Sequence, residues 1–157
     1  MAKVTKAALK KMPKSLLKPP PRFKKLRKED FLADMERLGE DIAEEFKEQL
    51  IENIESNAYG FKNAESTTQR KGSDIPLIDT HQMVDAIYRE GTTVSVEDTP
   101  RDDSPLTNLE LAMVHEYGVK DKGIPPRPVW RNTMRDMKPS ARKHIETLFT
   151  TGKFKKR

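Results

Sequence analysis

The chain has 157 residues, enough for one domain of ordinary size, and only 34% of them are hydrophobic while 35% are charged. This apolar content is low for a globular domain, so we expect a modest core and some segments that do not fold alone. The absence of cysteine excludes disulfides and cysteine-based metal sites.

Charge is unevenly distributed along the first third of the chain. Residues 1–28 hold eleven Lys or Arg and no Asp or Glu, whereas residues 29–55 hold eleven Asp or Glu and only two basic residues. Four prolines interrupt the basic segment, and three of them are consecutive, which favours an extended and stiff conformation. We therefore expect residues 1–28 to be an arm that is disordered when free and becomes ordered on a partner.

The sequence leaves two kinds of binding partner for this arm. One is an acidic protein surface, on which the arm would be anchored by its apolar side chains, namely Leu9, Met12, Leu16, Leu17 and Phe23. The other is DNA, which lysine-rich segments bind without sequence specificity through phosphate contacts. The basic N-terminus is not followed by an uninterrupted apolar run, and the chain has no run of 18 apolar residues, so neither a secretory signal nor a membrane span is expected.

Residues 29–57 carry the clearest helical pattern. Apolar residues recur every three or four positions, which places them on one face of a helix about 40 Å long. The stripe consists of Phe31, Met35, Leu38, Ile42, Phe46, Leu50 and Ile54, and it is widened by Leu32, Ala43 and Ile51. Gly39 lies inside this helix and either permits a close backbone approach or marks a bend. A single helix with one apolar stripe needs a partner surface.

The middle of the chain predicts a loop, a short helix and a strand. Residues 60–76 are polar and contain glycine, so we expect a long mobile loop. Asp79 or Thr80 can cap a short helix over residues 81–88, whose apolar side carries Met83, Val84 and Ile87. The alternation over residues 92–99, with Val94 and Val96 on one face, predicts a half-buried strand.

Two further helices are expected in the last third. Thr107 and Glu110 have the spacing of a capping box, and Gly118 is placed to end the helix that they begin. Its predicted inner face is Leu109, Ala112, Met113 and Tyr117. The proline-rich residues 124–128 must be extended, and Pro128 suits the start of the next helix.

This last helix has Val129, Trp130, Met134 and Met137 as its predicted apolar side chains. Pro139 is expected to break or kink it, and a final segment brings Ile145, Leu148 and Phe149 inward before a basic tail at residues 151–157. The fold class is therefore α+β, with residues 29–150 as one domain of helices packed on a small antiparallel sheet.

No motif in the chain points to catalysis, a metal or a cofactor. His115-Glu116 begins like the zinc-protease pattern H-E-x-x-H, but the position four residues after His115 is Val119. Phosphate-binding, dinucleotide-binding and serine-hydrolase glycine motifs are also missing from the sequence. We therefore expect a non-enzymatic protein that holds no cofactor and no metal.

Two patches resemble a known family. One is Pro76-Leu77-Ile78-Asp79-Thr80, and the other is a helix ending at His115-Glu116-Tyr117-Gly118, followed after a short gap by Ile124-Pro125-Pro126-Arg127-Pro128. In this order, after a long amphipathic helix, they resemble the phage virion-morphogenesis and tail-completion proteins, over roughly residues 29–150. The chain departs from that pattern at His81, where the family has glycine, and at Val129-Trp130, where it has an aromatic residue first.

The resemblance implies a structural virion protein of the phage neck. Such a tail-completion or tail-terminator subunit would be made in the bacterial host cytoplasm and would form a ring, expected to be a hexamer, that joins head and tail. Its partners would be adjacent neck, connector and tail-tube proteins, with DNA in the channel as a further contact and no membrane. The interface candidates are Asp79, Thr80, His115, Glu116, Tyr117, Gly118, Ile124, Pro125, Arg127, Pro128 and Trp130.

Two questions stay open at the level of sequence. Arg127, which neighbouring prolines hold in place, can offer a bidentate fork to a carboxylate of another subunit, or it can tie its loop to an acid of its own subunit. The alternative function is a nucleic-acid-binding accessory protein that acts through the basic arm, and a small phage enzyme or toxin is a third. Flanking portal, capsid and tail-tube genes would favour the neck protein.

Overall fold

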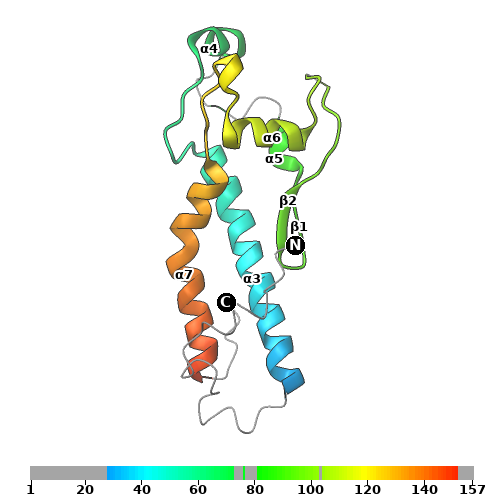
Figure 1. The fold of residues 1–157 in the computed structure, drawn as a ribbon, viewed down its shortest axis with the longest axis vertical. Helices are drawn as coiled ribbons and strands as arrows, with labels where there is room; N and C mark the ends of the chain where they lie inside the picture. The colour runs from blue at the N-terminus through cyan, green and yellow to red at the C-terminus, as the bar shows by residue number, and fades with distance from the viewer. Residues whose placement is uncertain (1–27, 73–75, 77–80, 103, 152–157) are drawn as a thin grey trace.

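The computed structural model describes residues 28–72, 76, 81–102 and 104–151 (Figure 1). The helices are α3 (Lys28–Glu55), α4 (Glu65–Lys71), α5 (Gln82–Asp85), α6 (Asn108–Tyr117), the 3-10 helix η2 (Lys120–Lys122) and α7 (Val129–Thr151). The strands are β1 (Ile87–Glu90) and β2 (Thr93–Val96), and they form one small antiparallel sheet. The fold is therefore α+β, as predicted. The arm anchors and the basic tail from residue 152 lie outside the described residues.

The body of the molecule is built on α3 and α7, which lie side by side and antiparallel (Figure 1). At one end, the rings of Phe31 and Phe149 meet edge to face with 5.6 Å between their centroids. Further along, Phe46 of α3 packs against Trp130 at the start of α7, at 5.9 Å. The long helix predicted over residues 29–57 is confirmed. None of the described helices is long and apolar enough to span a membrane.

Of the two effects predicted for Pro139, a break or a kink, the break is absent from α7. The helix continues through Pro139 as one element of 23 residues. Proline has no backbone N–H, so one helical carbonyl loses its hydrogen bond. Because Pro139 is exposed, this carbonyl lies on the solvent side of α7, while α3 packs along the opposite side. The expected inward face of the last segment is confirmed only for Leu148, because Ile145 and Phe149 are each 38% exposed.

The apolar stripe of α3 faces the core along most of its length. Leu38, Ala43, Leu50 and Ile54 are buried, whereas Leu32 is 54% exposed, so its predicted place in the stripe is wrong. The remaining stripe residues are half-buried, namely Phe31, Met35, Ile42, Phe46 and Ile51. Leu32 belongs to the first turns of α3, and at that end α7 is the described element that packs beside the helix (Figure 1).

Gly39 allows the turn between β1 and β2 to approach α3 closely. A Cβ atom at this position would lie 2.8 Å from Cγ2 of Thr92, which is too close for a real contact. Of the two roles predicted for this glycine, the close approach is therefore present. The hairpin is also tied to α3 by Arg89, whose Nε donates to Oε2 of Glu44 at 2.6 Å. This hydrogen bond, followed by the one from Lys47, lowers the pKa of Glu44 below its usual range.

The segment predicted as one helix over residues 81–88 is divided between a helix and a strand. Helix α5 has four residues, and Ile87 belongs to β1, where it pairs with Val96. The helical pattern ends early because Ile87 gains a strand partner, Val96, from beyond the next turn. Gly91, at φ +56°, forms the tight turn that brings the two strands together. The predicted strand is confirmed over Thr93–Val96. The predicted caps Asp79 and Thr80 lie outside the described residues.

The loop expected at residues 60–76 contains helix α4. The backbone amides of Thr67 and Thr68 both bond to the carbonyl of Ala64, and Gly72 ends the helix at φ +70°. A short hydrogen-bonded turn therefore forms where composition alone predicted irregular backbone.

Helix α6 begins as predicted, but its buried face differs from the predicted one. Both hydrogen bonds of the Thr107–Glu110 capping box are present, and Gly118 ends the helix. The buried positions, however, are Asn108, Ala112 and Glu116, whereas Met113 is 53% and Tyr117 is 65% exposed. The polar residues turn inward because each finds hydrogen-bond partners there. Asn108, for example, donates from Nδ2 to Oγ1 of Thr99 and accepts at Oδ1 from Nη1 of Arg101, both at 2.9 Å.

Candidate assembly surface

Arg127 is directed into its own chain. The side chain is 8% exposed, and its Nη2 donates to the carbonyl of Lys62 at 3.1 Å. Its Nη1 lies 3.1 Å from Nδ1 of His115, and its backbone amide donates to the carbonyl of the same histidine at 2.6 Å. Of the two partners considered for Arg127, the structure has the one within the subunit, although a carbonyl and an imidazole take the place of an acid. Burial lowers the pKa of Arg127, but a guanidinium stays protonated.

Glu116 links the end of α6 to the beginning of α7. Its two carboxylate oxygens accept hydrogen bonds from the backbone amides of Trp130 and Arg131, at 3.1 and 3.2 Å. Oε1 also accepts from Nε of Arg131 at 2.7 Å. Glu116 thus supplies, from another helix, the anionic cap that the proline-rich entry into α7 cannot supply. Because Glu116 and Arg127 are buried and bonded internally, these two interface candidates hold the subunit together.

The loop between α6 and α7 is closed by a small bridge. Val119 and Ile124 exchange backbone hydrogen bonds of 2.9 and 3.0 Å. Gly118 precedes the bridge at φ +71° and ψ 173°, and a Cβ atom there would lie 2.6 Å from the carbonyl oxygen of Ile124. A side chain at position 118 would therefore separate α6 from the proline-rich segment. Pro125, by contrast, is exposed and available to a partner.

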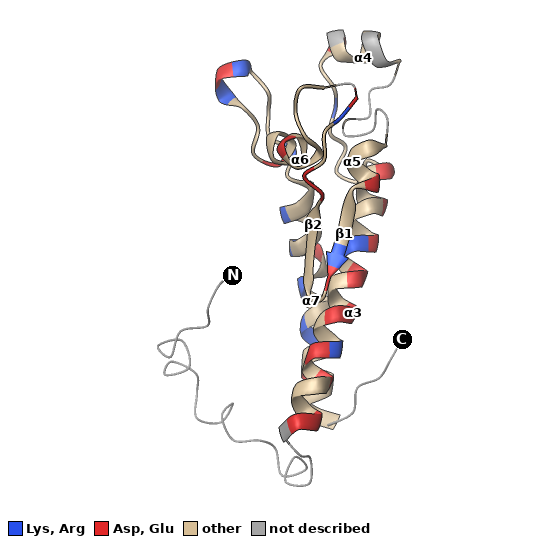
Figure 2. Ribbon diagram, turned by 90° about the vertical axis from the view of Figure 1, so that its right-hand side faces the viewer, with Lys and Arg blue, Asp and Glu red and all other residues tan. Residues whose placement is uncertain are grey.

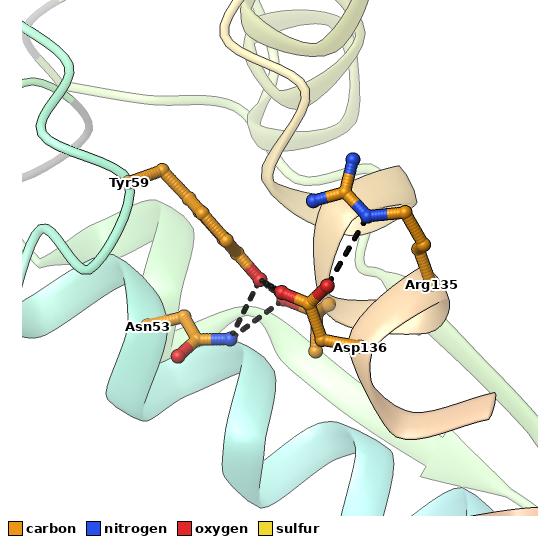
Figure 3. Close-up of polar contacts among 5 residues, drawn as sticks. Asn53, Tyr59, Arg135 and Asp136 are labelled. Carbon is orange, nitrogen blue, oxygen red and sulfur yellow. Dashed lines mark hydrogen bonds and ion pairs between the residues drawn. The ribbon is translucent and has the colours of Figure 1, made fainter. Parts of the chain in front are cut away.

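A second polar cluster fastens the end of α3 to α7 (Figure 3). Nδ2 of Asn53 donates to Oγ1 of the fully buried Thr133 at 2.9 Å and lies 3.2 Å from the hydroxyl of Tyr59. That hydroxyl donates to Oδ2 of Asp136 at 3.0 Å, and Oδ1 of Asp136 accepts from Arg135 at 3.1 Å. Burial raises the pKa of Tyr59, and the Asp136 carboxylate acts in the same direction. Sequence reasoning missed this cluster because its members are far apart in the chain.

An apolar groove opens between β2, α6 and α7. It encloses about 310 Å³, and its walls include Val94, Met113, Tyr117, Trp130 and Met134. Tyr117, which was predicted to face inward, is 65% exposed, and Met134 is 63% exposed. The guanidinium of Arg131 stacks over the Tyr117 ring at 5.3 Å, which fixes the rim of the groove.

The structure brings most of the predicted interface residues into one region. His115, Glu116, Tyr117, Gly118, Arg127 and Trp130 meet where α6, the proline-rich segment and α7 converge, and only Tyr117 among them is largely exposed. The sequence did not indicate that Val94 and Met134 would join Tyr117 at a groove. Asp79 and Thr80 lie outside the described residues.

No group of three or more His, Asp or Glu among the described residues is arranged to hold a metal ion. In comparisons with known proteins, no family model, curated protein or solved structure matches the chain significantly.

Proposed function

We propose that this protein is a structural subunit of a phage neck, a tail-completion or tail-terminator protein that forms a ring between head and tail. The observation that carries the proposal is the groove with Met113, Tyr117 and Met134 at its edge, each more than half exposed. Contiguous apolar surface of this kind is typical of an interaction site. The resemblance of residues 76–80 and 112–128 to the neck family supplies the identity of the assembly.

The arrangement of the polar groups supports a structural role. The buried charges Glu116 and Arg127 bond to the chain's own backbone and stabilise the junction of α6 and α7. Helices α3 and α7 form a thin body with acidic residues along α3 (Figure 2), and Leu32 and Ile145 stay partly exposed at its far end. A subunit of this shape gains stability when neighbours cover its apolar surfaces.

Deletion of the gene in the phage that encodes it tests this function. We expect DNA-filled heads and separate tails, or tails of abnormal length, in electron micrographs of the lysate. The matched control is the same deletion complemented from a plasmid, which should restore joined particles. Infectious particles of normal form without complementation would rule out the neck function.

The competing function is DNA binding through the basic arm, which the eleven positive charges of residues 1–28 favour. Two full-length variants separate the alternatives, one with the arm lysines neutralised and one with Leu9, Met12, Leu16, Leu17 and Phe23 changed to serine. Docking on protein requires the apolar residues, so the serine variant should fail to join heads to tails. If it joins them as well as wild type and only the neutralised variant fails, the arm binds phosphate.

A further inference from the structure

Strand β2 has an open edge. In an antiparallel pair, hydrogen-bonded and non-hydrogen-bonded residue pairs alternate, and the amide of Glu97 donates to the carbonyl of Ala86 at 2.8 Å. Counting from that bonded pair along the register, Ser95 bonds to Tyr88, whereas the N–H and C=O groups of Val94 and Val96 point away from β1. None of the described residues forms a hydrogen bond with these outward groups.

The apolar groove runs along this same edge. Three consecutive residues of β2 line it, Val94, Ser95 and Val96, and no residue of β1 does. Side chains of successive strand residues point to opposite faces of a sheet, so neither face alone would present three consecutive residues to one groove. The groove therefore runs along the edge of β2. A groove that combines free backbone groups with apolar side chains suits an added extended segment. The segment would gain main-chain hydrogen bonds from β2 and bury its own apolar side chains.

We propose that this groove binds residues 14–18 of the N-terminal arm of a second copy, which adds them as a strand to β2. The inference rests on the proposed function, because a neck ring requires contacts between copies. Residues 14–18 read Lys-Ser-Leu-Leu-Lys and lie between Pro13 and Pro19. The five residues span about 17 Å when extended, which matches a short strand such as β2.

Charge and length support this occupant. Residues 93–117, which supply β2 and α6, hold six Asp or Glu and one Arg, whereas the arm is basic throughout. Among the residues that line the groove, the charged ones are Glu116 and Arg131, and they are paired with each other. The arm precedes α3 and reaches up to about 90 Å when extended, which is enough to reach a neighbouring subunit.

Disulfide trapping tests the contact directly, because the chain contains no cysteine of its own. Full-length Leu16→Cys and Ser95→Cys proteins are mixed under mild oxidation and resolved on a non-reducing gel. We expect a disulfide-linked heterodimer, and little of it when Glu48→Cys, an exposed position on α3, replaces Ser95→Cys. Equal trapping at both positions, or stronger trapping of Leu9→Cys than of Leu16→Cys at residue 95, would overturn the assignment.

The same pair placed in one chain separates a second copy from the chain's own arm. The double variant Leu16→Cys/Ser95→Cys should give linked dimers and larger species. A product that is only an internally linked monomer would overturn the assignment to a second copy.

Amide hydrogen exchange tests strand addition itself. In concentrated full-length protein, the amides of Val94 and Val96 should exchange at least about tenfold more slowly than in the full-length Leu16→Ser/Leu17→Ser variant. Ser95 is the internal control, because its amide already bonds to β1. Equal exchange of Val94 and Val96 in both proteins would reject the added strand. Both measurements use purified protein, so their failure is distinguishable from a failure of the neck function, which the gene deletion reports.

Discussion

The carboxylate of Glu116 lies 2.7 Å from Nε of Arg131 and bonds to two backbone amides at the start of α7. The last turn of one helix therefore caps the first turn of another, and the junction that supports the groove depends on a single buried acid.

Glu116→Gln should lower the free energy of unfolding by about 1–3 kcal/mol, because the cap loses its charge and the amide group faces Arg131. Thermal or urea unfolding followed by circular dichroism measures the change. Glu48→Gln is the matched control on an exposed site of α3 and should stay within about 0.5 kcal/mol of wild type. Equal effects of the two substitutions would mean that Glu116 does not act as a cap.

Arg127→Ala should lower the melting temperature, with a loss on the order of 2 kcal/mol, because the carbonyl of Lys62 and the ring of His115 lose their charged donor. Arg135→Ala, at a side chain that is 66% exposed, should have little effect on melting. An Arg127→Ala protein that melts like wild type and yet fails to assemble would instead place the role of Arg127 at an interface.

Gly118→Ala should destabilise the fold by about 3 kcal/mol or more, since alanine at φ +71° and ψ 173° is strained and its Cβ would collide with Ile124. Gly123→Ala separates the two causes. Gly123 also has a positive φ, +65°, but open space lies around it, so the expected loss is about 1–2 kcal/mol. Comparable losses in the two variants would show that the contact with Ile124 is unimportant.

Leu38→Asp should destabilise strongly, by several kcal/mol, because it places an unpaired charge at a position that is only 4% exposed. Leu32→Asp makes the same chemical change on the same helix where the side chain is 54% exposed. Its melting temperature should stay close to that of wild type. Chemical denaturation of both variants checks the difference, and a mild effect of Leu38→Asp would contradict the burial of the α3 stripe.

Stability at alkaline pH should depend on Tyr59. Its pKa is raised in the folded protein, so the folded state holds the phenolic proton more tightly than the unfolded chain does. The contribution is therefore fully present below the unfolded pKa, near pH 10, and is lost as the pH rises through the folded pKa. Tyr59→Phe should cost about 0.5–1.5 kcal/mol at pH 7 and show a smaller decline between pH 9 and 11. Parallel declines in the two proteins would contradict a role for this phenol.

Local patterns in the sequence were sufficient for several elements. The spacing of Leu38, Leu50 and Ile54 predicted α3, and the Thr107–Glu110 pair with Gly118 predicted both ends of α6. These features depend on residues within one or two helical turns of each other. Their physical causes, the helical period and the capping of free backbone groups, act before any tertiary contact is made.

Tertiary structure decided which side of α6 faces inward and where Ile87 belongs. Periodicity favoured Met113 and Tyr117 as core residues, but Asn108 and Glu116 are buried in their place because hydrogen-bond partners from other segments satisfy them. Ile87 continued a helical pattern, yet it pairs with Val96 across a turn. The groove and the open edge of β2 follow from these two outcomes. A single helical or strand pattern cannot predict them, because the energy of burying a polar group or pairing a strand depends on residues that only the fold brings near.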